Sequence, residues 1–174
     1  GLEIPPELED DTATGAAART RIGAHLATFT EEFRSLGIQL GARYDGSPLI
    51  AADAEAPPED SPFTYTPSAV PGGRAPHAWL ADGSALADRL GNGFTLLRLA
   101  ESAPEGSGFA AAATRHRIPL TIATIDDGAV RALCGRDLVL VRPDQHIAWR
   151  GDAEPDTPAD ILAAATGGNR TDRT

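Results

Sequence analysis

Cysteine is the side chain in this sequence best suited to redox chemistry, and it occurs once, as Cys134. A single cysteine excludes an internal disulfide, a Cys-x-x-Cys redox pair and a zinc cluster built from thiolates. Cys134 stands between Leu133 and Gly135, and a lone cysteine in apolar surroundings is usually a small core residue. We therefore expect a buried, unreactive thiol.

Two glycine pairs could be taken for phosphate-binding turns: Gly91-Asn-Gly93 and Gly106-Ser-Gly108. The dinucleotide fingerprint needs three glycines between a strand and a helix, so that the phosphate meets the helix N-terminus. The first pair follows a predicted helix and precedes a predicted strand, and the second pair has no third glycine. A Walker-type loop needs a lysine, and the chain contains none. Both pairs are therefore interpreted as plain turns.

Four histidines are candidate metal ligands, but none has a partner at the spacing of helical or hairpin ligands: His25, His77, His116 and His146. We interpret His146 as a half-buried residue of a hairpin. In the string Arg74-Ala-Pro-His77, polar residues flank a proline on a rigid loop, which is typical of a local hydrogen-bond network. We predict a structural loop network that involves Arg74 and His77.

Two further pairs could be mistaken for a functional site. Asp126 and Asp127 are adjacent carboxylates, as in some acid–base pairs, but they follow a predicted strand and precede Gly128. This position favours a turn and a helix cap. Trp79 and Trp149 are expected to be core anchors. We expect no catalytic, cofactor-binding or metal-binding residue on this chain.

The charge of the chain excludes other classes of partner. Its 25 acidic and 15 basic residues give a formal charge of −10, which disfavours binding to nucleic acid or to anionic lipid. No apolar run approaches the ~20 residues of a membrane helix, and no signal segment opens the chain. We expect a cytoplasmic protein.

The sequence contains no methionine, even at position 1, so we expect a fragment, a processed product or a tagged chain.

The N-terminal half contains one clear helix. Residues 1–15 are acidic and Pro-containing and predict a loose leader. Apolar residues then recur at steps of three and four, which indicates a helix over 16–36 with one apolar stripe: Ile22, Leu26, Phe29, Phe33 and Leu36. Thr12 or Thr14 can cap its start, and Gly37 can end it in a left-handed turn. We expect the stripe to pack on a neighbouring domain or subunit.

The next segment has little periodicity. It allows short strand-like pieces at Ile38–Leu40 and Pro48–Ile50, within a first unit that spans 16–52. Residues 53–77 are a Pro/Gly-rich connection, and a connection of this length is usually functional, disordered or laid over a partner.

Residues 78–168 show a regular order of elements. Two β-branched or apolar strands flank an Ala-rich helix, a hairpin follows, and a helix with proline in its first turn closes the unit. The predicted elements are a short helix at Gly83–Leu90, a strand at Phe94–Leu99, a helix at Phe109–His116, a strand at Leu120–Ile125, helical turns at Ala129–Cys134, a hairpin of Leu138–Arg142 and His146–Arg150, and a helix at Pro158–Thr166. This order predicts an α/β fold with a thioredoxin-like mixed sheet, βαβ then ββα. The polar residues 169–174 predict a disordered tail.

Four strings in this order resemble the C-terminal region of FAD-dependent aromatic hydroxylases, the phenol hydroxylase and polyketide hydroxylase group. They are LGIQLGARYDGSP (36–48), PSAVPGGRAPHAWL (67–80), GFTLL (93–97) and LVRPDQHIAWR (140–150). The resemblance covers residues 19–166. It implies that the helix at 16–36 returns to a flavin domain and that the last unit is a thioredoxin-like domain without redox cysteines, often used in subunit contacts.

The resemblance further implies that the intact enzyme uses FAD, NAD(P)H and O2 to hydroxylate an aromatic ring. No flavin-binding motif is present here, so no family cofactor residue can be assigned to this chain. The implied partners are the flavin-binding part of the same enzyme and further copies in a homo-oligomer. An alternative is a free-standing, redox-inactive thioredoxin-like module that binds a partner or small ligand, and a thiol oxidoreductase is the third hypothesis.

Overall fold

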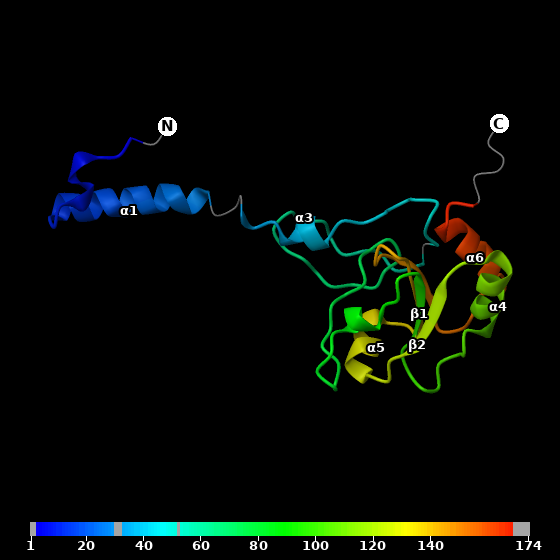
Figure 1. Ribbon diagram of the computed structural model, residues 1–174. Coiled ribbons are helices and arrows are strands. Elements are labelled where there is room, and N and C mark those ends of the chain that lie inside the picture. The colour runs from blue at the N-terminus through cyan, green and yellow to red at the C-terminus, as the bar shows by residue number, and fades with distance from the viewer. Residues whose placement is uncertain (1–2, 30–32, 52, 169–174) are drawn as a thin grey trace, which may run out of the picture.

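The centre of the protein is a four-stranded mixed sheet. The computed structural model describes residues 3–29, 33–51 and 53–168 (Figure 1). The sheet has the order β2-β1-β3-β4, in which β1 and β2 are parallel and the pairs β1–β3 and β3–β4 are antiparallel. Its strands are β1 (Phe94–Arg98), β2 (Leu120–Thr124), β3 (Leu138–Val141) and β4 (Ile147–Gly151).

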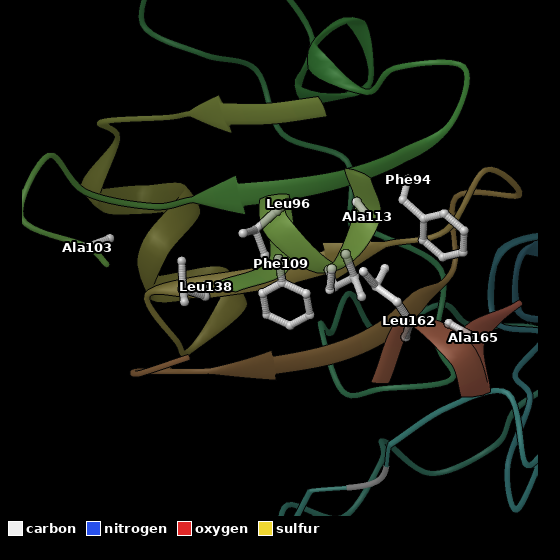
Figure 2. Packing of buried hydrophobic residues seen from close by; sticks show 11 residues of the cluster. Phe94, Leu96, Ala103, Phe109, Ala113, Leu138, Leu162 and Ala165 are labelled. Carbon is white, nitrogen blue, oxygen red and sulfur yellow. The ribbon is translucent and has the colours of Figure 1, made fainter. Parts of the chain in front are cut away.

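Helices cover both faces of this sheet. The helices of the second half are α4 (Ser107–His116), α5 (Gly128–Cys134), α6 (Pro158–Ala165) and the 3-10 helix η2 (Leu86–Arg89). Phe109 of α4 and Leu162 of α6 pack with Leu96 and Leu138 on one face (Figure 2). Leu97 belongs to the second cluster, with residues of η2 and α5. Strands buried on both faces need continuous apolar runs, which explains the sequences of β1 and β3.

The predicted fold class is confirmed. The order βαβ then ββα is present, and each strand lies within two residues of its predicted bounds. Asp127 caps α5, since its carboxylate accepts from the backbone N–H groups of Ala129 and Val130 at 2.9 and 3.2 Å. Gly167, with a φ of +79°, follows α6 as expected for a helix C-terminus. The helix predicted at Gly83–Leu90 is only the 3-10 turn of η2.

The N-terminal helix is shorter than predicted. Helix α1 spans Ala13–Thr28 and is capped by Thr12, whose hydroxyl accepts from Gly15 N–H at 3.1 Å. The predicted loose leader contains a 3-10 helix, η1 (Pro6–Glu9), and Arg19 of α1 donates to the carbonyls of Leu8 and Asp10. Part of the predicted helix, residues 30–32, lies outside the described residues.

The prediction that Gly37 ends this helix is wrong. Gly37 lies inside a second helix, α3 (Leu36–Leu40), so the strand-like piece expected at Ile38–Leu40 is helical. A side chain at Gly37 would collide with the carbonyl oxygens of Ser61 and Thr64, so close approach explains this glycine. The second expected strand, Pro48–Ile50, is a turn. The tail at 169–174 lies outside the described residues.

The irregular connection is joined to the sheet by main-chain hydrogen bonds. Gly72 N–H donates to Ile147 O at 2.8 Å, and Ile147 N–H donates to Gly73 O at 2.9 Å. Ala51 N–H donates to Ala148 O at 2.8 Å, and Ala75 N–H to Gln145 O at 2.8 Å. These bonds cover the outer edge of β4.

A buried ion pair fixes the same connection. The Arg150 side chain is 2% exposed, and its guanidinium donates to Asp53 and Glu55 at 2.6 Å each. It also donates to the carbonyl of Cys134 at 2.9 Å. The partial burial of Asp53 opposes ionisation, but the hydrogen bond from Arg150 and the other favourable contacts outweigh it and lower the pKa of Asp53.

We predict that Asp53→Asn lowers the free energy of unfolding at pH 7 by about 1–3 kcal/mol, because it leaves a buried guanidinium short of a charged acceptor. The folded-state pKa of Asp53 lies below its ordinary value of 3.8. Its contribution is therefore complete above that pH and is lost as the pH falls through the lowered value. Urea unfolding at pH 7 and in acid measures the difference in free energy of unfolding between the parent and Asp53→Asn. This difference should be smaller in acid.

The matched control is Asp60→Asn, because Asp60 pairs with Arg43 through a carboxylate that is 80% exposed. Exposed pairs contribute little, so this variant should change stability by less than about 1 kcal/mol. Equal losses from the two substitutions would contradict the importance of the Arg150 pair.

Candidate functional site

The cysteine expected to be inert is buried at the end of α5. Cys134 is 1% exposed. Burial raises the pKa of its thiol to about 11, although the nearby charge of Arg150 acts in the opposite direction. At neutral pH the side chain is therefore a thiol and not the thiolate that redox chemistry needs. Burial of Cys134 confirms the prediction of a core residue.

The glycine pair Gly106-Ser-Gly108 lies at the N-terminus of α4, the position where a βαβ unit can bind an anion. The backbone N–H groups of Gly108 and Phe109 already donate to one carboxylate oxygen of Glu154, at 2.8 and 3.2 Å. A pyrophosphate there would meet a carboxylate and not free donors. The residues of this turn do not fit the pyrophosphate of a flavin nucleotide.

The structure places Arg74 and His77 in different surroundings. One Arg74 nitrogen, Nη2, donates to Gln145 Oε1 at 2.8 Å, and its backbone bridges to His146 beside β4. The exposed ring of His77 packs edge-on against Trp79, with centroids 5.0 Å apart. No hydrogen bond joins Arg74 to His77 among the described residues, and a shared loop network stays a prediction.

The other candidate ligands are scattered over the molecule. His25 lies on α1 and His116 ends α4, both exposed. His146 is half-buried beside Tyr44, with ring centroids 4.7 Å apart. In the described ranges, no group of three or more His, Cys, Asp and Glu side chains is placed to hold a metal ion. Likewise, none of the helices described is long and apolar enough to cross a membrane.

Exposed apolar side chains on and beside α1 form a candidate interaction surface. We call Ile22, Leu26 and Phe29 the α1 stripe. Leu26 is 54% exposed and Phe29 is 43% exposed. Among the described residues, α1 packs mainly against η1, and α1 extends away from the sheet (Figure 1). A helix with one apolar face needs a surface to cover it, so the α1 stripe is the first candidate interaction site.

One predicted core anchor belongs instead to the surface. Trp79 is 70% exposed, so the prediction that it anchors the core is wrong. Trp79 forms an isolated β-bridge with Ala85, and the turn between them faces solvent. Trp149 is half-buried against Phe109, with centroids 5.2 Å apart, as a core residue would be.

Sequence reasoning missed the Arg150 ion pair. Its only signal is an arginine at the end of an apolar strand and an acidic stretch that contains Asp53 and Glu55, nearly one hundred residues earlier. Nothing in the spacing of the sequence links the two segments.

Comparison with known proteins places this chain in a family. Residues 68–168 match the family model described as aromatic-ring hydroxylase, C-terminal. The FAD-dependent monooxygenase apdD of Emericella nidulans is 37% identical over 92% of this chain and 27% of its own length. Phenol 2-monooxygenase of a Pseudomonas strain is 31% identical over 89% of this chain and 29% of its length.

Solved structures agree with these matches. RebC-10x, described as native and bound to K252c, superposes with a TM-score of 0.79 at 34% identity, over 96% of this chain and 32% of that one. The flavin-dependent monooxygenase PieE, in complex with FAD and substrate, gives 0.68 at 26% identity, over 92% and 31%. The chain thus spans about a third or less of the length of the proteins that it matches. From the family match and these relatives, the chain belongs to the C-terminal family of the aromatic-ring hydroxylases.

Proposed function

We propose that this chain is the non-catalytic C-terminal part of an FAD-dependent aromatic hydroxylase, of the polyketide or phenol type. The observation that carries the proposal is the match of residues 68–168 to the hydroxylase family, together with relatives that are FAD-dependent monooxygenases. In the intact enzyme, FAD reduced by NAD(P)H would activate O2 to hydroxylate an aromatic ring. The residues of this chain would hold the flavin-binding part in place.

Three charged side chains at positions that could do chemistry support a non-catalytic role, because they are engaged in the fold. Glu154 fills the N-terminus of α4, and Asp127 caps α5. Arg150 is paired with Asp53 and Glu55. These contacts stabilise the mixed-sheet unit, and they engage Glu154, Asp127 and Arg150 within the fold.

The α1 stripe supports the bracing role. Leu26 and Phe29 of the stripe are exposed here, and burial of an exposed leucine or phenylalanine contributes about 1.5–3 kcal/mol. Helix α1 precedes the unit that matches the hydroxylase C-terminal family. The partner that we propose for its apolar stripe is therefore the flavin-binding part of the same enzyme. Subunit contacts of a homo-oligomer are the second role that we propose for this chain.

We predict that Leu26→Asp weakens association with a separately expressed flavin-binding part of the enzyme at least tenfold, because it places a charge in an apolar interface. Titration calorimetry measures the affinity. The matched control is Ala24→Asp, an exposed position on the opposite side of α1, which should leave the affinity unchanged. Since Leu26 is exposed in this chain, thermal unfolding of both variants should match the parent.

The same titration separates the two main hypotheses. Co-elution of the two parts in gel filtration, lost in Leu26→Asp, supports the bracing role. Independent elution of a stable chain that does not bind the flavin-binding part would favour the free-standing, redox-inactive module and would overturn the proposal.

We predict that Cys134 supports no disulfide exchange. Its buried thiol, with the pKa raised to about 11, should react with an aromatic disulfide reagent at pH 7.5 far more slowly than free cysteine does. In guanidinium chloride the reaction should become fast, because unfolding exposes the thiol. Disulfide reduction by the native chain that disappears in Cys134→Ser would instead establish the thiol oxidoreductase hypothesis.

A further inference from the structure

The two outer edges of the sheet are treated differently. The connection covers the edge of β4 through the main-chain bonds of Gly72, Gly73 and Ala51. In the part of the chain that the structure describes, β2 pairs with β1 alone, so its other side is an open edge. An open edge presents unpaired N–H and C=O groups to any strand that can reach it.

This edge lacks the devices that usually keep strands apart. The sequence of β2, Leu-Thr-Ile-Ala-Thr, contains no charge and no proline. Ile122, at its centre, is 37% exposed. Soluble proteins normally protect an edge with lysine, proline, a bulge or a covering segment. An unprotected edge rich in β-branched residues indicates a strand partner.

The hydrogen bonds to β1 identify the groups that are free. Phe94 N–H donates to Pro119 O at 2.9 Å, and Ile125 N–H donates to Arg98 O at 2.7 Å. Backbone groups alternate in direction along a strand, so the odd-numbered residues face β1. The even-numbered residues Leu120, Ile122 and Thr124 therefore direct their N–H and C=O groups to the open side.

We propose that β2 pairs antiparallel with β2 of a second copy of this chain, about a two-fold axis at Ile122, so that one sheet continues through the dimer. In this register Ile122 faces itself and Leu120 faces Thr124. Every outward group of the strand then finds a partner of the kind an antiparallel ladder needs. A closed two-fold pair is also the usual geometry of homodimers.

The charges beside the strand are complementary in the same register. Arg117, just before β2, and Asp126, just after it, are both exposed. Antiparallel pairing about Ile122 sets position 117 of one copy against position 127 of the other, so Arg117 lies near Asp127 and its neighbour Asp126 at both ends of the interface. A parallel pairing would place like charges together. The flanking charges therefore favour this orientation.

The groove between β2 and α4 fits the same arrangement. It has a volume of about 370 Å³ and is lined mainly by small or apolar side chains, among them Ala110, Thr114, Pro119 and Ile122. The two-fold axis brings the second Ile122 to this face, next to the small residues of α4. Burial of the exposed isoleucine surface from both copies adds to the hydrogen bonds.

Two factors limit the affinity of this pairing. Each copy carries a formal charge of −10, so the copies repel one another until salt screens them. The contact of two short strands is smaller than a standard interface of about 1,600 Å². We therefore expect a dimer with a micromolar or weaker Kd at physiological salt. The inference deepens the subunit contact of the proposed function, but it stands on the surface of this chain alone.

Cysteine cross-linking of the full chain tests the register directly. Ile122→Cys should form a disulfide-linked dimer on mild oxidation in 0.15 M salt. The Cα atoms of a hydrogen-bonded antiparallel pair lie about 5.5 Å apart, which is within the range of a disulfide. Thr121→Cys is the matched control on the same strand, since Thr121 would face Ala123 of the other copy. The parent chain should remain monomeric on a non-reducing gel, because Cys134 is buried.

A charge exchange tests the orientation. Arg117→Asp or Asp126→Arg alone should weaken the dimer about threefold or more in sedimentation equilibrium, and the double variant should restore it. Aspartate tolerates the left-handed backbone of position 117, where φ is +55°, and circular dichroism checks that each variant is folded.

The cross-linking and sedimentation results do not depend on the flavin-docking proposal, which is tested separately by titration calorimetry with Leu26→Asp. No cross-link from Ile122→Cys, or equal cross-links from both cysteine variants, would overturn the inference. It would also fail if the flavin-binding part protected Ile122→Cys from a maleimide while no dimer formed, because the edge would then belong to a contact within the enzyme.

Discussion

The buried guanidinium of Arg150 holds the irregular connection against the sheet, because its acidic partners lie in that connection. An arginine side chain that is 2% exposed is tolerated only when its charge and its donors are matched, because removal of an ion from water costs several kcal/mol. Two of its partners, Asp53 and Glu55, come from a segment without helix or strand. The need to pair one cation therefore fixes a long irregular connection on the sheet.

That constraint has consequences at the sheet edge. Once Asp53 is held beside β4, the chain that follows runs back to the same strand, and Gly72 and Gly73 add their hydrogen bonds to Ile147. The positive φ of Gly72, +96°, explains why glycine is favoured there, since other residues rarely adopt this backbone conformation. The outer strand β4 is thereby closed to other chains. The connection behaves as part of the domain, and its lack of periodicity reflects a covering role.

The sheet could be predicted from the sequence because its signals are local. Leu138–Val141 is a continuous apolar run, and Pro158 in the first turn of α6 marks a helix start. Together with the order of elements, these patterns determine strand directions. The contacts of Arg150 could not be predicted in this way, since they join residues nearly one hundred positions apart. The role of Gly37 was missed for the same reason, because it depends on the carbonyl of Ser61.

Burial of aromatic residues was a second limit. A tryptophan in an apolar string predicts a core position, but Trp79 lies beside a short turn at the surface, where it contacts His77 and stays 70% exposed. Similarly, the spacing of Ile22, Leu26 and Phe29 predicts an apolar face without specifying what covers it. Periodicity reports that a surface should be buried. It does not report which molecule buries it.

The positions where a βαβ unit does chemistry are satisfied internally in this protein. The N-terminus of α4 is filled by the carboxylate of Glu154, and a helix dipole that is already matched by a negative charge has little attraction left for a phosphate. The thiol of Cys134 is held protonated by burial. Among the described residues, apolar side chains of the α1 stripe and the outer backbone groups of β2 remain uncovered. The contacts proposed for this chain would cover these two surfaces.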